Sequence, residues 1–581
     1  MARDEPLLHG SRASSEQDIE EEDALLTGQH KPQALRRRGW PFWRKVALVI
    51  WAIVATAIVI ILGVLYQHSR TSHPAPSNDD FGDEPKASGK RNLIFMVSDG
   101  MGPTSLSLTR SFEQESKGLP FDHELVLDSH LIGSSRTRST SSLITDSAAG
   151  ATAFACGKKS YNSAISVLPD HSACGTVLEA AKKAGYKTGL VVTTYVTDAT
   201  PACFAAHVNT RSEEDLIAEQ ELGFGHPLGP VVDLIFGGGR CHFLPNTTQG
   251  SCRHDDVNVL NKAKHNGFKY ASNREEYDSL GSELELPLIG LFADHQIPYE
   301  LDRTTQSSKY PSLSEMAETA LKGLSAATKD SDKGFFLMIE GSRIDHAGHA
   351  NDPVAQVHEV LEYDKTFSLV LDFLDKDTVE GVVVSTSDHE TGGLSTARQL
   401  HADYPEYAWY PAVLANATHT ASHLGHQLKE HKELHPAAGK DALQTFIRSQ
   451  VLKLGLGIHD ATDSEVEKIL KTLDDDAEHI HWTLADMISR RAQIGWATHG
   501  HSAVDVNIYA SNPTDAKKLI GNHENTDIGE FLSGYLDLDL DEVTRELNRK
   551  ADETGMEGWM GEELGEASWL GLADYHGEFR R

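Results

Sequence analysis

Short apolar runs alternate with helical patterns over most of the chain. The four clearest runs are each followed by polar or charged side chains, and they cover Leu93–Val97, Thr188–Thr194, Phe335–Ile339 and Val382–Thr386. Continuous apolar runs of this length are typical of strands buried on both faces, as in a parallel sheet covered by helices. Helical patterns lie between them, for example over 176–184 and 354–375. The pattern predicts an α/β fold, with one large doubly wound domain and a mostly parallel central sheet flanked by helices.

A different pattern lies nearer the N-terminus. Residues 46–66 are 21 consecutive positions without a formal charge, rich in Val, Ile, Ala and Leu. About 20 such residues span the hydrocarbon core of a bilayer as a helix, whereas a cleaved signal peptide begins earlier and has a shorter apolar run. A buried core helix is the alternative. Arg or Lys at positions 36–38, 44 and 45 places this side in the cytoplasm by the positive-inside rule, and the C-terminal part in a lumen or outside the cell.

These patterns divide the chain into five parts. We expect a cytoplasmic tail at 1–45, a transmembrane helix at 46–66, a polar linker at 67–90, a large lumenal domain at 91–533 and an acidic tail at 534–581. The stretch 399–491 is rich in His, Tyr and polar residues, and we expect it to be a crown-like insertion over the mouth of the fold. The tail has 13 acidic and 5 basic residues, which predicts little core of its own.

Short motifs fit a lumenal domain on a single membrane anchor. Asn246 and Asn416 each begin an Asn-X-Thr sequon, a glycosylation signal that is meaningful on the lumenal side. Leu25 and Leu26 follow Glu-Glu-Asp-Ala, as in the acidic dileucine sorting signals of lysosomal and vacuolar membrane proteins. Such a signal implies a sorting adaptor as a cytoplasmic partner. Sequons and acidic stretches beside Leu pairs also occur by chance.

Composition adds two constraints. Of 581 residues, 86 are Asp or Glu and 53 are Lys or Arg, and the net charge of −33 argues against nucleic acid as a partner. The charge also argues, at first, against an anionic substrate. Five Cys are too few for a disulfide scaffold. Cys241 and Cys252 are close enough in sequence to close a loop, but the sequence leaves the pairing open and the odd count leaves at least one thiol unpaired.

Acids and histidines gather where the predicted strands end, the edge at which open α/β sheets bind ligands. The residues at this edge are Asp99, Asp198, Thr200, Glu340, Asp345, His349, Asp388, His389 and His501. Several carboxylates in one crevice repel one another unless divalent cations lie between them. Mixed Asp and His sets suit zinc, and oxygen-only sets suit magnesium. One Asp-x-x-x-His pair alone is usually a solvated helix face, but four such features at four strand ends indicate a metal cluster.

A second feature is Ser147, at the predicted start of an Ala-rich helix. A Ser in this position meets the amides and the positive dipole end of the helix, which favour an attacking alkoxide and a bound phosphate. In isolation, Asp146 or Ser147 would more simply cap the helix. The sequence shows no Gly-x-Ser-x-Gly elbow and no histidine base near Ser147, so metal coordination is the expected activator of the hydroxyl.

Together the motifs resemble the alkaline phosphatases, most closely the membrane-anchored fungal vacuolar members of that family. The resemblance runs from about residue 91 to 510, and it rests on Val-Ser-Asp99-Gly-Met-Gly, Thr-Asp146-Ser147-Ala-Ala, Asp198-Ala-Thr200-Pro-Ala, Glu340-Gly-Ser-Arg-Ile-Asp345 and Ser-Asp388-His389-Glu-Thr-Gly-Gly. It implies a metal-dependent phosphomonoesterase that hydrolyses a broad range of phosphate monoesters through a covalent phosphoserine. It also implies a homodimer in the vacuole membrane, single-pass and type II, with a lumenal catalytic domain.

The resemblance assigns roles around two Zn²⁺ and one Mg²⁺ per subunit. Ser147 would accept the phosphoryl group, Arg211 would clamp the phosphate with its two-pronged guanidinium, and Asp146 would help to orient Arg211. The metal sets would be Asp345, His349 and His501 for the first zinc, Asp99, Asp388 and His389 for the second, and Asp99, Thr200 and Glu340 for magnesium, with Asp198 acting on the magnesium through water.

Two residue assignments and two alternative functions stay open. His499 also fits the last zinc position, although His501 matches the family spacing better. His346 stands where bacterial relatives carry Lys, which leaves the metal preference and the pH optimum open. One alternative is a metal-dependent phosphodiesterase or sulfatase on the same scaffold, although those enzymes usually lack the clamp at Arg211. The other is a glycosylated membrane protein whose metal cluster is structural. Bound cations would also remove the objection to an anionic substrate, because three divalent ions more than offset five acidic ligands.

Overall fold

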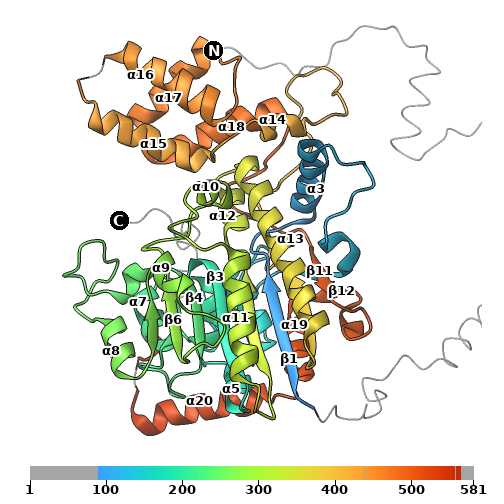
Figure 1. Ribbon diagram of the computed structural model, residues 1–581, viewed down its shortest axis with the longest axis vertical. Coiled ribbons are helices and arrows are strands. Elements are labelled where there is room, and N and C mark those ends of the chain that lie inside the picture. The colour runs from blue at the N-terminus through green and yellow to red at the C-terminus, as the bar shows by residue number, and fades with distance from the viewer. Residues whose placement is uncertain (1–88, 438, 557, 564–581) are drawn as a thin grey trace, which may run out of the picture. The chain divides into compact units, whose positions relative to one another are not determined.

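The computed structural model of the protein describes residues 89–563 except 438 and 557 (Figure 1). The predicted cytoplasmic tail with Leu25 and Leu26, the predicted transmembrane helix and most of the linker lie outside these residues. Within the part that is described, no helix combines the length and the apolar character needed to cross a bilayer.

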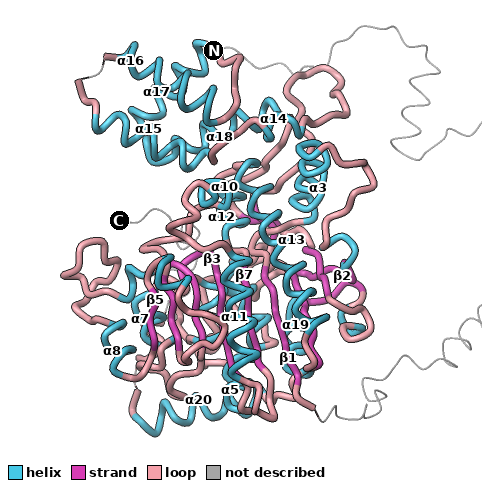
Figure 2. The backbone as a smooth tube through the Cα atoms, viewed as in Figure 1, coloured by secondary structure: helices cyan, strands magenta, loops and turns pink. Residues whose placement is uncertain are grey.

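The centre of the fold is a ten-stranded sheet in the order β12-β2-β11-β8-β1-β7-β3-β4-β6-β5 (Figure 2). Its strands are β1 Arg91–Val97, β2 Leu131–Arg136, β3 Lys187–Tyr195, β4 Leu234–Gly238, β5 Lys269–Ala271, β6 Leu288–Leu291, β7 Phe335–Glu340, β8 Glu380–Thr386, β11 Val506–Ala510 and β12 Gly521–Glu524. β11 runs antiparallel to β8 and β2, while the other pairings of this sheet are parallel. The predicted α/β fold with a mostly parallel central sheet is confirmed.

Alternate side chains of β1 point to opposite faces of the sheet, and both faces are covered. Leu93, Phe95 and Val97 join one buried core, whereas Ile94 and Met96 join another. Helices over the first face include α4 Ser147–Cys156, α5 Val177–Lys183, α6 Ala199–Ala205, α7 Glu214–Glu221, α8 Val259–His265 and α19 Asn525–Tyr535. Those over the second are chiefly α11 Leu313–Ala327 and α13 Pro353–Lys376 (Figure 1). Burial from both sides explains why the strands appear in the sequence as continuous apolar runs.

Between β9 Glu390–Thr391 and β10 His501–Ser502 the chain forms a helical insertion. Its helices are α14 Pro411–Ala415, α15 Ala421–Leu434, α16 Lys440–Phe446, α17 Asp463–Asp475 and α18 Ile480–Ala492. Their apolar residues share a core with Leu108 and Phe112 of α3 Pro103–Lys117. β9 and β10 pair antiparallel, with His501 opposite Thr391. This pairing brings the chain back, after the whole insertion, to β11, which lies between β2 and β8 in the main sheet.

The predicted acidic tail differs from the expectation that it has little core. Residues Leu540–Thr554 form helix α20, whose Val543 and Leu547 are buried against Ala180 of α5. Lys183 pairs with Glu542 and Glu546 beside this contact. The acidic residues of α20 lie on its outer side while its apolar residues recur every three or four positions, and this amphipathic pattern holds the helix on the domain.

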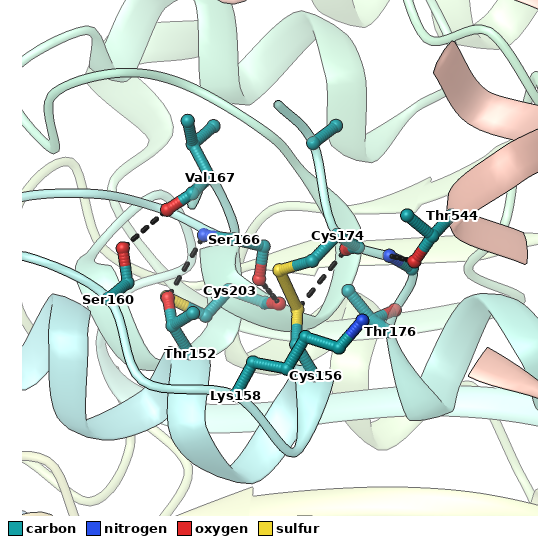
Figure 3. The surroundings of a disulfide bond; sticks show 12 residues. Thr152, Cys156, Lys158, Ser160, Ser166, Val167, Cys174, Thr176, Cys203 and Thr544 are labelled. Carbon is teal, nitrogen blue, oxygen red and sulfur yellow. Dashed lines mark hydrogen bonds between the residues drawn. A yellow bond between two sulfur atoms is a disulfide. The ribbon is translucent and has the colours of Figure 1, made fainter. Parts of the chain in front are cut away.

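Two disulfides are present, Cys156–Cys174 and Cys241–Cys252, and Cys203 is a buried free thiol. Cys156 is the last residue of α4, so the first disulfide ties the end of this helix to the segment before α5 (Figure 3). Beside it, the Thr152 hydroxyl of α4 accepts a hydrogen bond from the Ser166 amide at 3.0 Å. These contacts fix the helix that begins at Ser147.

Candidate metal centre and active site

Five of the predicted site residues come from the carboxyl ends of four strands that are neighbours in the sheet, in the order β8-β1-β7-β3. Asp99 follows β1, Glu340 ends β7, and Asp388 with His389 follows β8. Asp198 follows β3 and caps the N-terminus of α6, where its carboxylate accepts a hydrogen bond from the Ala199 amide at 2.7 Å. Parallel strands present these ends at one edge of the sheet, and the predicted residues therefore converge there.

The first predicted zinc set is assembled as one group. Asp345, His349 and His501 each offer a ligand atom, and these atoms lie within 4.8 Å of one another. Asp345 and His349 share the short helix α12 Arg343–His349 at i and i+4, which places both on one face. His501 Nε2 lies 3.1 Å from His349 Nε2 and 3.6 Å from Asp345 Oδ1.

The second predicted zinc set is also assembled and is more deeply buried. The ligand atoms of Asp99, Asp388 and His389 lie within 4.8 Å of one another, and all three residues are buried. His389 Nε2 is 3.2 Å from Asp388 Oδ2 and 3.6 Å from Asp99 Oδ1. The stacked rings of His389 and His501, with centroids 3.5 Å apart, place this group directly beside the first.

In all three histidines Nδ1 points away from the other ligands, and its hydrogen bond fixes a tautomer that suits metal binding. His501 Nδ1 donates to the Thr145 carbonyl at 2.8 Å, and His349 Nδ1 donates to the His499 carbonyl. His389 Nδ1 lies 3.2 Å from the Thr391 hydroxyl, which itself donates to Asp345 Oδ1 at 2.5 Å. A neutral imidazole that donates through Nδ1 keeps a lone pair on Nε2, and in each case Nε2 is the atom that faces the other ligands.

The third predicted set contains buried oxygens without hydrogen-bond partners, as expected of the ligands of an oxygen-coordinated cation. Thr200 Oγ1 and Glu340 Oε2 are buried and have no hydrogen-bond partner among the described residues. The same holds for Asp99 Oδ1 and Asp388 Oδ2 in the second group. Burying an oxygen without a partner costs about 1–3 kcal/mol, more when it is charged, so four of them in one crevice fit ligands of cations.

Charge repulsion in this crevice shows in the carboxyl pKa values of the metal-free site. Burial and the neighbouring acids Asp388, Asp345 and Glu340 raise the pKa of Asp99 well above its ordinary value. Burial and Asp198 do the same to the pKa of Glu340, and burial with Asp345 raises that of Asp388 to about 6. Without cations the site therefore holds protons, which bound divalent ions would replace.

Ser147 is the first residue of α4 and is 4% exposed. Its Oγ lies 3.0 Å from His389 Nε2, the inward-facing nitrogen of the second group. No histidine lies near Ser147 in the sequence, but the fold brings His389, 242 positions away, to its hydroxyl. His389 does not act as a free base if its Nε2 lone pair is committed to a cation. A cation held by His389 Nε2 would then lie within reach of the hydroxyl and could lower its pKa.

Arg211 faces the site from the loop after α6 and is held by two carboxylates. Its Nη2 contacts Asp198 Oδ1 at 2.7 Å, and its Nη1 lies 3.5 Å from Asp146 Oδ2. Asp146 is also the N-cap of α4, accepting from the Ala149 amide at 3.0 Å, and it accepts from the Ser163 amide at 2.8 Å. The predicted role of Asp146 in orienting Arg211 is thus shared with Asp198, whose contact is the shorter one.

Thr391 is a further site residue, which was not predicted from the sequence. Its hydroxyl lies between Asp345 of the first group and His389 of the second, as described above. The signal was present, because Thr391 belongs to the Asp-His-Glu-Thr-Gly-Gly motif. Only the fold shows that its hydroxyl links ligands from two strands.

Outside the predicted site, Glu179, His207 and His226 form a further buried group, which is an ion pair rather than a metal site. Glu179 Oε1 lies 2.9 Å from His207 Nε2 and 3.0 Å from His226 Nε2, and all three side chains are fully buried. His226 Nδ1 accepts from the Leu228 amide at 3.1 Å, so its proton is on Nε2 and no lone pair faces the group. His207 donates through both nitrogens, to Ser166 O and to Glu179. Despite burial, Glu179 raises the pKa of His207, and this pair anchors the segment that leads to Arg211.

The geometry favours His501 over His499 as the last ligand, and this prediction has a direct test. His499 Nδ1 contacts the His349 carbonyl at 2.8 Å, and its ring stacks on Trp482 instead of entering either group. We expect His501→Ala to lose about one zinc per subunit and His499→Ala to keep its metal, because the His499 contact to His349 Nδ1 comes from the backbone. Metal analysis by mass spectrometry measures both. Equal zinc loss in the two variants would contradict the assignment.

The sequons of Asn246 and Asn416 lie on the surface, and both asparagines are exposed. Their side-chain amides donate to His254 O at 3.0 Å and to Ala412 O at 2.9 Å, within local turns. Both positions are therefore accessible to a modifying enzyme.

The chain matches the family model for alkaline phosphatase over residues 90–538. It is 51% identical to the repressible alkaline phosphatase of Saccharomyces cerevisiae over 523 residues, which cover 87% of this chain and 90% of that protein. The crystal structure of a cold-active alkaline phosphatase from Shewanella sp. superposes with a TM-score of 0.63 at 29% identity, covering 77% of this chain and 99% of the other. A mutant of the TAB5 alkaline phosphatase, solved with Mg bound, superposes with a TM-score of 0.52 at 26% identity, covering 78% and 99%.

Proposed function

Because the chain belongs to the alkaline phosphatase family and is a phosphatase, we propose that it hydrolyses a broad range of phosphate monoesters through a covalent phosphoserine at Ser147. The observation that carries this proposal is the 3.0 Å contact of Ser147 Oγ with His389 Nε2, inside the second metal group. A hydroxyl in that place is a nucleophile next to a site for positive charge.

Two Zn²⁺ and one Mg²⁺ per subunit are proposed at the three ligand sets. Mixed carboxylate and imidazole sets, at Asp345 with His349 and His501 and at Asp99 with Asp388 and His389, suit zinc. The oxygen ligands Thr200 and Glu340, with Asp99, suit magnesium. When bound, such cations supply positive charge that lowers the pKa of a hydroxyl or a water and stabilises a leaving oxygen.

In the first step the Ser147 oxygen attacks phosphorus while the bond from phosphorus to the substrate alcohol breaks. The N-terminal amides and the dipole of α4 favour the negative charge that gathers beside Ser147. Arg211 binds two phosphate oxygens through its guanidinium, and Asp146 and Asp198 hold it in place. In the second step water attacks the phosphoserine from the opposite side, releasing inorganic phosphate and restoring Ser147. Little of this machinery contacts the alcohol, which supports a broad substrate range.

The test compares a monoester with a diester of the same alcohol. We expect kcat/KM for 4-nitrophenyl phosphate to exceed that for bis(4-nitrophenyl) phosphate by at least about a hundredfold, because a diester lacks one of the oxygens that Arg211 and the cations would bind. Release of 4-nitrophenol at matched concentrations measures both rates. Faster diester hydrolysis would favour the phosphodiesterase alternative.

We also propose that the protein is a single-pass type II protein of the vacuole membrane, with its N-terminus in the cytoplasm and its catalytic domain in the lumen. The uncharged run at 46–66 and the basic residues before it support this topology. Two disulfides suit an oxidising compartment, and glycans at Asn246 and Asn416 would fit it. A homodimer and a sorting adaptor remain proposals from the family resemblance and from the acidic dileucine signal.

The sorting signal has a matched control in the same tail. We expect the double variant Leu25→Ala and Leu26→Ala to leave the vacuolar membrane, because the adaptor would lose its two apolar contacts. The double variant Leu7→Ala and Leu8→Ala, at a second Leu pair in a weaker acidic context, should keep the wild-type location. Fluorescence microscopy of tagged protein compares them. Unchanged localisation of the first variant would refute the signal.

A further inference from the structure

Residues 163–166 form a strap between α4, the helix of the nucleophile, and the segment that carries the arginine clamp. On the side of α4, the Thr152 hydroxyl accepts from the Ser166 amide at 3.0 Å (Figure 3). On the other side, Ile165 and Val208 form an antiparallel bridge, with nitrogen–oxygen distances of 3.0 and 3.1 Å. The strap therefore determines how far apart these two segments lie.

The first residue of the strap, Ser163, bonds to both sides through its main chain. Its amide donates to Asp146 Oδ2 at 2.8 Å, and its carbonyl accepts from the Arg211 amide at 2.8 Å. Asp146 is the N-cap of α4, directly before Ser147, and its Oδ2 lies 3.5 Å from Arg211 Nη1. The three residues thus close a triangle of contacts, in which Ser163 fixes the backbone of the clamp relative to the nucleophile.

This triangle depends on a backbone conformation that serine rarely adopts. Ser163 is buried and is the third residue of a turn in which the Ala164 amide donates to the Tyr161 carbonyl at 3.1 Å. Its φ is +83°, a value typical of the third residue of a type II turn, where glycine is usual. Because φ sets the direction of the amide relative to the carbonyl, a residue that cannot keep a positive φ cannot make both contacts.

The side chain of Ser163 adds a contact that glycine would lack. Its Oγ lies 3.2 Å from the Thr210 hydroxyl, which in turn lies 3.0 Å from Ser212 Oγ. These two partners flank Arg211 in the sequence, so the hydroxyl also acts on the segment of the clamp. An unfavourable φ persists only where the surrounding contacts enforce it, and such residues cluster at functional sites.

We propose that Ser163 is a positioning residue for phosphate binding, which holds Arg211 in register with Ser147 through its left-handed turn. It acts through Arg211, whose guanidinium must meet two phosphate oxygens while the nucleophile reaches phosphorus. A displacement of about 1 Å in such a group can cost about a hundredfold in rate. The inference rests on the proposed function of Arg211 and adds the residue that places it.

The test replaces Ser163 with Val, which is strongly unfavourable at a positive φ, and with Gly, which adopts it readily. We expect Ser163→Val to raise the inhibition constant of inorganic phosphate about tenfold and to lower kcat/KM for 4-nitrophenyl phosphate by a similar factor. Ser163→Gly keeps both main-chain contacts and should stay within about threefold of wild type in both measurements. Equal losses in the Val and Gly variants would overturn the role of the turn.

A double-mutant cycle with Arg211→Ala separates positioning from a general loss of structure. In the Arg211→Ala background, Ser163→Val should lower kcat/KM no further, because the group that it positions is gone. Effects that multiply in the double variant would overturn the proposal. Ser163→Ala, which removes only the contact to Thr210, replaces the Val variant in the cycle if that variant does not fold, with an expected loss of about threefold.

The matched control is Asp537→Val, at a second positive φ of +54°. Asp537 pairs with Arg91, at the end of β1 opposite to Asp99. This variant should lower the unfolding midpoint and leave the inhibition constant of phosphate unchanged, and an equal rise there would count against positioning by Ser163. An inhibition constant that is unchanged in Arg211→Ala would instead overturn the proposed phosphate clamp, whatever the result at Ser163.

Discussion

Replacing Ser147 with Ala should lower kcat for a simple phosphate monoester by at least about a thousandfold, equivalent to about 4 kcal/mol in activation free energy. The variant lacks the oxygen that would form the phosphoserine, and nothing else at that position can replace it. Its metal content and unfolding midpoint should stay at wild-type values, because Ser147 is not among the grouped ligands and Asp146 provides the cap of α4. Steady-state kinetics, metal analysis and thermal unfolding on one preparation measure all three.

The control for this variant is Ser142→Ala, which removes an exposed hydroxyl five positions earlier in the chain. It should keep wild-type kinetics. A structural role for the metal cluster, without catalysis, predicts instead that Ser147→Ala and Ser142→Ala behave alike. Substantial activity in Ser147→Ala would therefore remove the phosphoserine from the mechanism.

Removing the divalent cations should abolish activity and also change how stability depends on pH. Burial and neighbouring acids raise the pKa of Asp99 and Glu340 well above ordinary values, and that of Asp388 to about 6. A carboxyl whose pKa is raised on folding stabilises the folded protein at low pH, and this contribution is lost as the pH rises through the raised pKa. The metal-free site therefore loses this stabilisation as the pH rises from about 4 through the raised pKa of each acid, which for Asp388 is about 6. Cations bind the deprotonated ligands, so their contribution grows over the same range.

The measurable consequence is a gap in unfolding midpoint between metal-loaded and metal-free protein that widens with pH. We expect the gap to be small at pH 5 and about 10 °C or more at pH 8. Adding Zn²⁺ with Mg²⁺ back should restore the midpoint and the activity together. Activity that survives chelation would indicate that His389, 3.0 Å from Ser147, acts as a free base. A gap that stays constant with pH would contradict the assignment of the buried acids as ligands.

The central strands were predictable because they are buried on both faces. Continuous apolar runs at Leu93–Val97 and Val382–Thr386 correspond to β1 and β8, and each run ends where a polar site residue follows. The direction of β11 and the helix α20 were not predictable in the same way. An antiparallel strand at 506–510 has the same local pattern as a parallel one, and its direction depends on where the chain re-enters the sheet. Residues 534–581 are rich in acidic residues and their apolar residues are scattered, so the burial of Val543 and Leu547 was not evident from the sequence.

The gathering of acids and histidines was predictable from the strand ends, whereas their division into two mixed ligand sets came from the family resemblance. The structure brings each of these sets together. Contacts that join distant segments were not predictable. The approach of His389 to Ser147, and the Thr391 hydroxyl between Asp345 and His389, depend on the alignment of separate strands. A cavity beside Trp482 of α18 depends on how the helical insertion packs. The sequence of the insertion is rich in polar residues and histidine, and it resembles that of ordinary surface helices.

The position of His501 on β10, after the whole insertion, bears on when the enzyme becomes active during its synthesis. The ligands of the centre begin at Asp99 and end at His501. At about 5–20 residues per second, roughly 20–80 s of translation separate these two residues. A nascent chain that already contains Ser147 and most of the insertion still lacks the last ligand of the first group. With His501 as the proposed last ligand, we expect the chain to be catalytically silent until this residue has been made, and metal loading to be a final step of maturation.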